Sequence, residues 1–85
     1  SNPVVQQTVA VAEEAEVLDR DTVLLELAHG QTLDTFQQAA FADARTMKLD
    51  LVDSIVANAP ALLQPLLDDG RLVQDDTGLY SRVAS

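Results

Sequence analysis

The chain has 85 residues, of which 14 are Asp or Glu and 5 are Lys or Arg, so its formal net charge is −9. This length allows one small domain, and the absence of Cys excludes a disulfide scaffold and a Cys-rich zinc site. No apolar run approaches the roughly 20 residues of a membrane helix, and no signal-peptide pattern opens the chain. We therefore expect a cytoplasmic protein, and the start at Ser1 without Met predicts a piece excised from a larger one.

The acidic balance argues against a general nucleic-acid surface, because such binding needs several Lys or Arg side chains facing phosphates. The five cations are scattered along the chain, and most have acidic neighbours. A DNA-binding regulator would need four of them on one face, namely Arg45, Lys48, Arg71 and Arg82. The same charge disfavours an anionic membrane and favours either simple solvation or a basic partner.

Residues 1–18 form the first expected segment, an N-terminal helix or linker ahead of a domain over residues 19–85. Apolar side chains there follow a helical spacing, and the alternative is a strand over residues 4–11, because Val and Thr are strand-prone. This stripe lies outside the unit that follows. We therefore expect it to bind a partner through Val5, Val9 and Ala12.

The next expected element is a helix over residues 22–29. Asp19 or Asp21 supplies its N-terminal cap, and Gly30 ends it in a left-handed conformation. Its apolar face consists of Val23, Leu24, Leu27 and Ala28.

Thr32 begins a second helix, with a capping side chain and an acidic first turn. Its apolar stripe comprises Leu33, Phe36, Ala40 and Phe41. Residues 45–48 break the apolar pattern and predict the end of this element.

A third helix is expected over residues 49–57, with Leu49, Val52, Ile55 and Val56 on one face. Residues 58–60 should end it, because the residue before a proline disfavours the helical region. A Leu-rich helix then begins within residues 62–64, has Pro65 in its first turn and ends at Gly70. The alternative is one kinked helix that continues from Leu49.

The C-terminal residues predict a β-hairpin with strands near 71–74 and 79–83. Residues 75–78 carry turn chemistry, since Asp tolerates turn geometry and Gly78 supplies a positive φ. The expected fold class is therefore mainly α with a small hairpin (α+β). Its core should combine Leu33, Phe36, Phe41, Val52, Ile55, Leu63, Leu66 and Leu67, closed on one side by Leu72, Leu79 and Tyr80.

Residues 62–73 and 75–80 resemble the end of a winged-helix domain. In that family the third helix ends at a Gly after a Leu-Leu-x-x-Gly run, here residues 66–70, and a two-stranded wing follows. The resemblance covers residues 21–83 in element order and residues 66–80 in sequence character. It implies a three-helix core followed by a two-stranded wing.

Many winged helices insert the third helix into the major groove of DNA. Here that helix presents Gln64, Asp68 and Asp69, with no Lys or Arg before Arg71, and so departs from the DNA-binding pattern. Acidic winged helices serve as interaction or dimerisation modules attached to enzymes or regulators. The order of elements is also similar to the accessory C-terminal region of some bacterial methyltransferases.

Residues that could carry chemistry are few. His29 is the only histidine, so it provides neither a catalytic triad nor a metal set, and its place at a helix end suits a cation without a catalytic role. We expect no catalytic, metal or cofactor site. One alternative is an acyl-carrier-like protein with phosphopantetheine on Ser54, because Asp53-Ser54-Ile55 is similar to the Asp-Ser-Leu tripeptide of those proteins. Against it, Ser54 falls within the apolar run and not at a helix start.

The sequence therefore predicts a non-catalytic interaction or regulatory module of a larger bacterial protein. Its apolar face would dock on a neighbouring domain of the parent protein or on a second copy, and its acidic rim would select the charge of the partner. The alternatives are a DNA-binding transcriptional regulator and the carrier protein.

Overall fold

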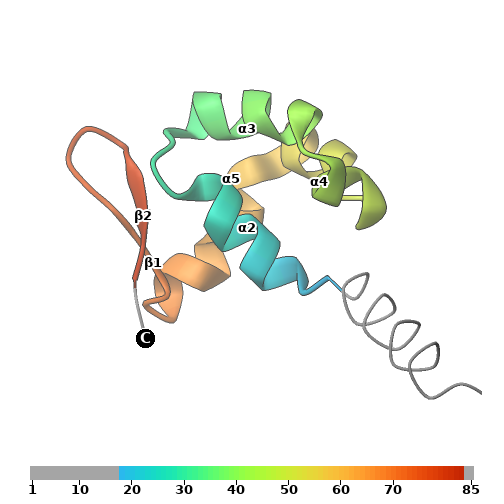
Figure 1. Ribbon diagram of the computed structural model, residues 1–85. Coiled ribbons are helices and arrows are strands. Elements are labelled where there is room, and N and C mark those ends of the chain that lie inside the picture. The colour runs from blue at the N-terminus through green and yellow to red at the C-terminus, as the bar shows by residue number, and fades with distance from the viewer. Residues whose placement is uncertain (1–17, 84–85) are drawn as a thin grey trace, which may run out of the picture.

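A computed structural model describes residues 18–83 (Figure 1). The elements in this range are α2 (Arg20–Ala28), α3 (Leu33–Ala42), α4 (Ala44–Lys48), α5 (Val52–Asp68), β1 (Leu72–Gln74) and β2 (Tyr80–Arg82). The hairpin lies at one end of the domain and α4 at the other, with α2, α3 and α5 between them (Figure 1). The expected α+β class with a small hairpin is confirmed. The segment expected over residues 1–18 lies outside the described range except for Leu18, which packs against the core.

Side-chain oxygens cap the first helices, as their sequences predict. The Asp19 carboxylate accepts the N–H of Asp21 at 3.3 Å and begins α2. At the start of α3, the Thr35 hydroxyl accepts the N–H of Thr32 at 2.8 Å, and the Thr32 hydroxyl accepts the N–H of Thr35 at 3.4 Å. These bonds satisfy N–H groups that have no partner within the helix.

The helix that begins at Thr32 ends before residues 45–48, as expected, but those residues belong to a further short helix, α4, which the sequence pattern does not predict. Asp43 ends α3 and at the same time caps α4, accepting the N–H of Arg45 at 2.9 Å. The fully buried hydroxyl of Thr46 donates to the carbonyls of Ala40 (2.6 Å) and Asp43 (2.7 Å). A polar residue that looks like a surface position in the sequence therefore joins two helices inside the domain.

The two helices expected over residues 49–57 and from residues 62–64 are one element, α5, which begins at Val52 and changes direction at Asn58. The helical backbone does break within the expected residues 58–60, but the second half begins directly after Asn58 and not at residues 62–64, so the whole arrangement is the kinked alternative. Asn58 has extended backbone angles, φ −162° and ψ 71°, and its side-chain oxygen accepts the N–H of Ala61 at 3.4 Å. Asn58 thus acts as the N-cap of the second half of α5, where Pro60 falls in the first turn.

The placement of Pro65 in the first turn of a new helix is also wrong, since it lies well inside the second half of α5. Proline has no N–H and removes one helical hydrogen bond, here to the carbonyl of Ala61. The exposed Pro65 ring is flanked by Leu63 and Leu66, which are fully buried. Burial of these leucines maintains the helix despite the missing bond.

Gly70 ends α5 with φ +82°, a value that a side chain would disfavour. The N–H of Gly70 bonds to the Leu67 carbonyl and that of Arg71 to the Leu66 carbonyl, the pattern of a Schellman motif. The chain then enters the antiparallel hairpin, in which Val73 pairs with Ser81.

The hairpin turn and the loop after α2 both fix β2. The Asp75 carboxylate accepts the N–H groups of Thr77 (2.9 Å) and Leu79 (3.0 Å), while Gly78 adopts φ +90°. On the edge of β2 away from β1, the Tyr80 carbonyl accepts the N–H of Gly30, and the Tyr80 N–H bonds to Gln31. Gly30 has the expected positive φ, 78°, but its N–H bonds to the hairpin and not to α2.

The core lies where α5 packs against α2, α3 and β1. Its buried apolar side chains are Val23, Leu24, Leu27, Ala28, Phe36, Ala40, Leu51, Ile55, Ala59, Leu63, Leu66, Leu72 and Tyr80. Of the expected core residues, Leu33 and Leu67 are half-buried and pack against this cluster, and Val52 and Leu79 are half-buried. The assignment of Phe41 to the core is wrong, because 65% of this residue is exposed.

Candidate functional site

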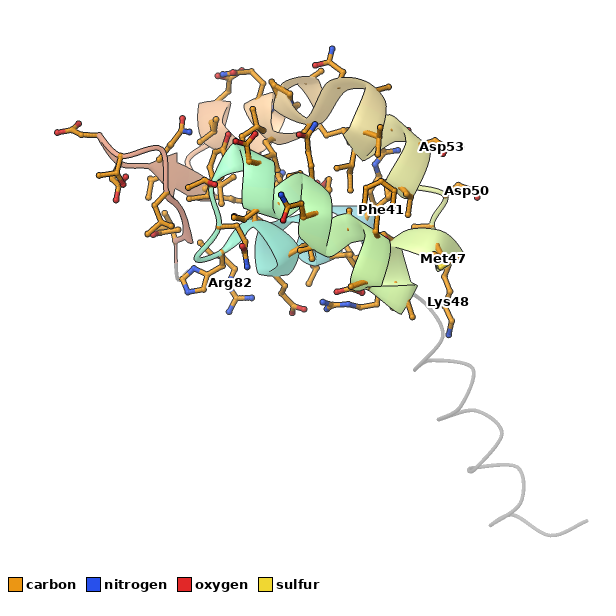
Figure 2. The ribbon with its side chains drawn as sticks, turned by 90° about the horizontal axis from the view of Figure 1, so that it is seen from above. Phe41, Met47, Lys48, Asp50, Asp53 and Arg82 are labelled. Carbon is orange, nitrogen blue, oxygen red and sulfur yellow. The ribbon has the colours of Figure 1, made fainter. Side chains whose placement is uncertain are left out.

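An open pocket of about 280 Å³ lies where α3, α4 and the start of α5 meet. Its lining residues are Phe41, Thr46, Met47, Asp50, Val52 and Asp53. Figure 2 shows Phe41, Met47, Asp50 and Asp53 gathered at this end of the domain, with Arg82 toward the other end. We call the apolar side chains of Phe41, Met47 and Val52 the Phe41 patch.

Local backbone geometry brings these side chains together. Phe41 lies in the last turn of α3, and the reversal at Asp43 places Met47 of α4 nearby. Asp50 links α4 to α5 with φ 53°, a left-handed conformation in which Asp is tolerated better than most residues. The N–H of Asp50 bonds to the Met47 carbonyl at 3.2 Å and that of Leu51 to the Thr46 carbonyl at 2.8 Å. The pocket is therefore built on a hydrogen-bonded turn.

In the folded domain, the large apolar side chains of the Phe41 patch remain largely in contact with water. Phe41 is 65% exposed and Met47 is 68% exposed, although Phe36 on the same helix α3 is fully buried. Phenylalanine and methionine are enriched at protein interfaces, and contiguous exposed apolar patches mark interaction sites. Chemically, this arrangement suits the burial of an apolar group.

The rim of the pocket carries two negative charges. Asp50 and Asp53 are exposed, and within residues 18–83 neither carboxylate forms an ion pair or accepts a hydrogen bond. Lys48, the adjacent cation, lies beyond Met47 on the side away from both aspartates (Figure 2). The electrostatic character at the pocket is therefore acidic.

Most cations in the described part of the chain are engaged by carboxylates elsewhere. Arg45 binds both Glu26 and Asp43, and its hydrogen bonds lower the pKa of Asp43 below the ordinary value. Arg82 lies 3.7 Å from the same Glu26 carboxylate. The arginines flanking Glu26 are therefore offset by acidic partners.

Arg71 pairs with Asp69 at 2.7 Å and with Asp21 at 3.1 Å. Hydrogen bonding from the Arg71 side chain lowers the pKa of Asp69. Lys48 and Arg82 lie toward opposite ends of the domain (Figure 2). Of the four cations that a DNA-binding regulator would gather on one face, Arg45, Arg71 and Arg82 each pair with carboxylates in the described part of the chain.

His29 contacts the hairpin and not a catalytic partner. Its Nδ1 atom accepts the backbone N–H of Arg82 at 3.0 Å. The side chain therefore serves as a hydrogen-bond acceptor for β2. Within residues 18–83, no group of three or more His, Asp or Glu side chains could hold a metal ion.

Ser54 lies in the first turn of α5 and is exposed. The expectation that it falls away from a helix start is therefore wrong, because α5 begins at Val52 and not at Leu49. The exposed position of Ser54 near a helix start thus satisfies one requirement of a carrier protein. The resemblance of Asp53-Ser54-Ile55 to the carrier tripeptide does not account for the hairpin of β1 and β2.

The expected partner-binding residues Val5, Val9 and Ala12 lie outside the described residues. The Phe41 patch is not apparent from the sequence, because Phe41 shares the spacing of the core stripe and Met47 falls where the apolar pattern breaks. A signal was available, since Phe41 lies about 140° around α3 from Phe36 and hence at the edge of any single stripe.

No helix in the part of the chain that the structure describes has the length and apolar character needed to cross a membrane. Comparison of the chain with protein-family models, curated proteins and solved structures gave no match.

Proposed function

We propose that this domain is a non-catalytic, cytoplasmic interaction module of winged-helix type, which docks on another protein surface through the Phe41 patch. The observation that carries the proposal is the exposure of Phe41 and Met47 around one pocket. In so small a domain, two large apolar side chains left in water imply a surface that is covered in the working protein. The neighbouring domain of a larger bacterial protein, or a second copy, would supply the cover.

The order of the elements supports the winged-helix part of the proposal. The four helices α2, α3, α4 and α5 precede an antiparallel hairpin in the described range, one more than the expected three-helix core, and the last helix ends at Gly70 in the run that resembles that family. The exposed positions in the second half of α5 are Pro60, Ala61, Gln64, Pro65 and Asp68. Because none is cationic, this helix favours a protein partner over DNA.

The test is site-specific photocrosslinking in the protein's own cells. A benzophenone amino acid replaces Phe41 in one variant and Met47 in another, with Val73 as the matched control because it is exposed on the hairpin. We expect the same crosslinked protein from positions 41 and 47 and none from position 73. A pattern that is identical at all three positions, or no product at 41 and 47, would refute docking through this patch.

Light scattering during size-exclusion chromatography separates the two kinds of cover. A dimer that forms with rising concentration, near twice the 9.1 kDa monomer mass, would identify a second copy. A monomer at every concentration would exclude a second copy and leave another protein surface, such as the neighbouring domain, as the cover.

The carrier-protein alternative is kept because Ser54 is exposed in the first turn of α5. A mass increase of one phosphopantetheine after treatment with a transferase, absent in Ser54→Ala, would establish it. An unchanged mass would remove it.

A further inference from the structure

We propose that the occupant of the Phe41 patch is a cationic polypeptide segment, in which one bulky apolar side chain enters the pocket and flanking Lys or Arg side chains pair with Asp50 and Asp53. This inference rests on the proposed function, and it adds the chemical class of the partner. The pocket has both apolar and acidic lining residues, and the carboxylates of Asp50 and Asp53 have no partner within the described residues. The other two candidate occupants, a second copy and residues 1–17, are themselves acidic.

The pocket combines an apolar floor with an anionic rim. Phe41, Met47 and Val52 supply the apolar surface, and Asp50 and Asp53 stand beside them. A purely apolar occupant would cover these carboxylates without compensating them, which costs free energy. A flanking guanidinium or ammonium group would instead restore their hydrogen bonds.

The two rim carboxylates have no partner in the described range, which is also true of Asp34 and Asp76, but Asp50 and Asp53 line the pocket and those two do not. Asp43 and Asp69 are bound by arginines, and Asp75 accepts hydrogen bonds from its own turn. Asp50 and Asp53 accept no hydrogen bond and form no ion pair among residues 18–83, and Lys48 lies on the far side of Met47 (Figure 2). Their charge is therefore available to a second molecule.

Charge disfavours a second copy as the occupant. A two-fold symmetric interface places the same patch on both partners, so Asp50 and Asp53 of the two copies would face one another. Each chain also carries a net charge of −9. Like charges brought together at an interface oppose association, whereas opposite charges favour it.

Charge also disfavours the chain's own N-terminal residues as the occupant. Residues 1–17 contain Glu13, Glu14 and Glu16 and no Lys or Arg. Their apolar side chains could fill the pocket, but their acidic side chains would add to the negative rim. A partner with both an apolar side chain and positive charge would complement the apolar floor and the acidic rim of the pocket.

The experiment uses the full 85-residue chain and a displayed library of random 12-residue peptides as the probe. Selection on the wild-type protein should enrich peptides with a bulky apolar residue next to Lys or Arg. Binding of the enriched peptides is then measured by fluorescence anisotropy. We expect Phe41→Ser and Met47→Ser each to weaken affinity by about tenfold, and added salt to weaken it as well.

Matched variants separate the rim charges from the overall charge. Asp50→Asn with Asp53→Asn removes two rim charges, whereas Asp34→Asn with Asp76→Asn removes two exposed charges elsewhere. The rim pair should weaken binding several-fold and the distant pair should change it little. Val73→Ser is the control for the loss of an exposed apolar side chain, and circular dichroism verifies that each variant is folded.

Each contrary outcome has a distinct meaning. Enriched peptides without basic residues that still require Phe41 would overturn the cationic partner and leave docking at the Phe41 patch standing. Basic peptides that bind Phe41→Ser as well as wild type, or that respond equally to the rim and distant pairs, would show attraction to overall charge and overturn the inference. If no peptide depends on Phe41, the inference fails, and the photocrosslinking result decides separately whether docking at the Phe41 patch stands.

Discussion

The two ends of the domain differ in how far their large apolar side chains are buried. At the hairpin end, Leu72 and Tyr80 are buried, and β2 is bonded on both edges, to β1 and to the loop at Gly30. At the other end, α4 turns the chain without covering Phe41 or Met47, which remain mostly exposed. Internal packing thus buries the largest apolar side chains of the hairpin, although Val73 and Val83 stay about half exposed, whereas Phe41 and Met47 at the other end are more exposed still.

Two phenylalanines on the same helix, α3, differ most in burial, since Phe36 is fully buried and Phe41 is mostly exposed. Phe36→Ala should destabilise the protein by about 3–5 kcal/mol, because the side chain is fully buried and its loss leaves a cavity. Phe41→Ala should change the free energy of unfolding by less than about 0.5 kcal/mol, because this side chain is mostly exposed. Urea unfolding of both variants measures the difference. Similar losses would mean that Phe41 is part of the core.

Thr46 lies at the boundary between the buried core and the pocket. Thr46→Val preserves its shape but removes the hydroxyl that donates to the carbonyls of Ala40 and Asp43. Leaving these carbonyls without their donor should cost about 1–3 kcal/mol in urea unfolding. Thr46→Ser, which retains the hydroxyl, is the control and should lose less. A loss in Thr46→Ser that equals or exceeds the loss in Thr46→Val would contradict the assigned role of the hydroxyl.

The second half of α5 offers a test of the interior proline. Pro65→Ala restores an N–H that can bond to the Ala61 carbonyl, and we expect a gain of about 1–2 kcal/mol in unfolding free energy. Pro60→Ala should give no such gain, since a proline in the first turn blocks no helical bond. Thermal and urea unfolding measure both variants. A loss of stability in Pro65→Ala would contradict the position of Pro65 inside a helix.

The smallest effect is expected at the hairpin turn, where hydrogen bonds from the Thr77 side chain and the Leu79 backbone hold the pKa of Asp75 below its usual value. Because the folded-state pKa is lowered, the contribution of Asp75 to stability is full above the unfolded-state value of about 4. It is lost as the pH falls through the lower folded-state value.

The destabilisation caused by Asp75→Ala should therefore be largest near neutral pH and shrink below a pH of about 4. Urea unfolding at a series of pH values measures it, with Asp76→Ala as the neighbouring control because Asp76 accepts no hydrogen bond from the described residues. A difference between Asp75→Ala and wild type that grows in acid would contradict the assigned role of the carboxylate.

Much of the local structure could be predicted because its causes are local. The caps at Asp19 and Thr32, the turn at Asp75 and the helix end at Gly70 each depend on a few neighbouring atoms. The apolar face of α2 was also predictable, since its spacing alone places Val23, Leu24, Leu27 and Ala28 on one side. The net charge was sufficient to argue against a general nucleic-acid surface, and the absence of Cys to exclude a disulfide scaffold.

The candidate site depended on contacts that no local pattern contains. Phe41 is exposed because α5 covers only one side of α3, and Thr46 is buried because α3 and α4 fold around it. The continuation of α5 past Asn58 and Pro65 depends on leucines packed against distant elements. Which side of a helix is covered is set by its neighbours in space, so only the tertiary structure decided that Phe36 is core and Phe41 is surface.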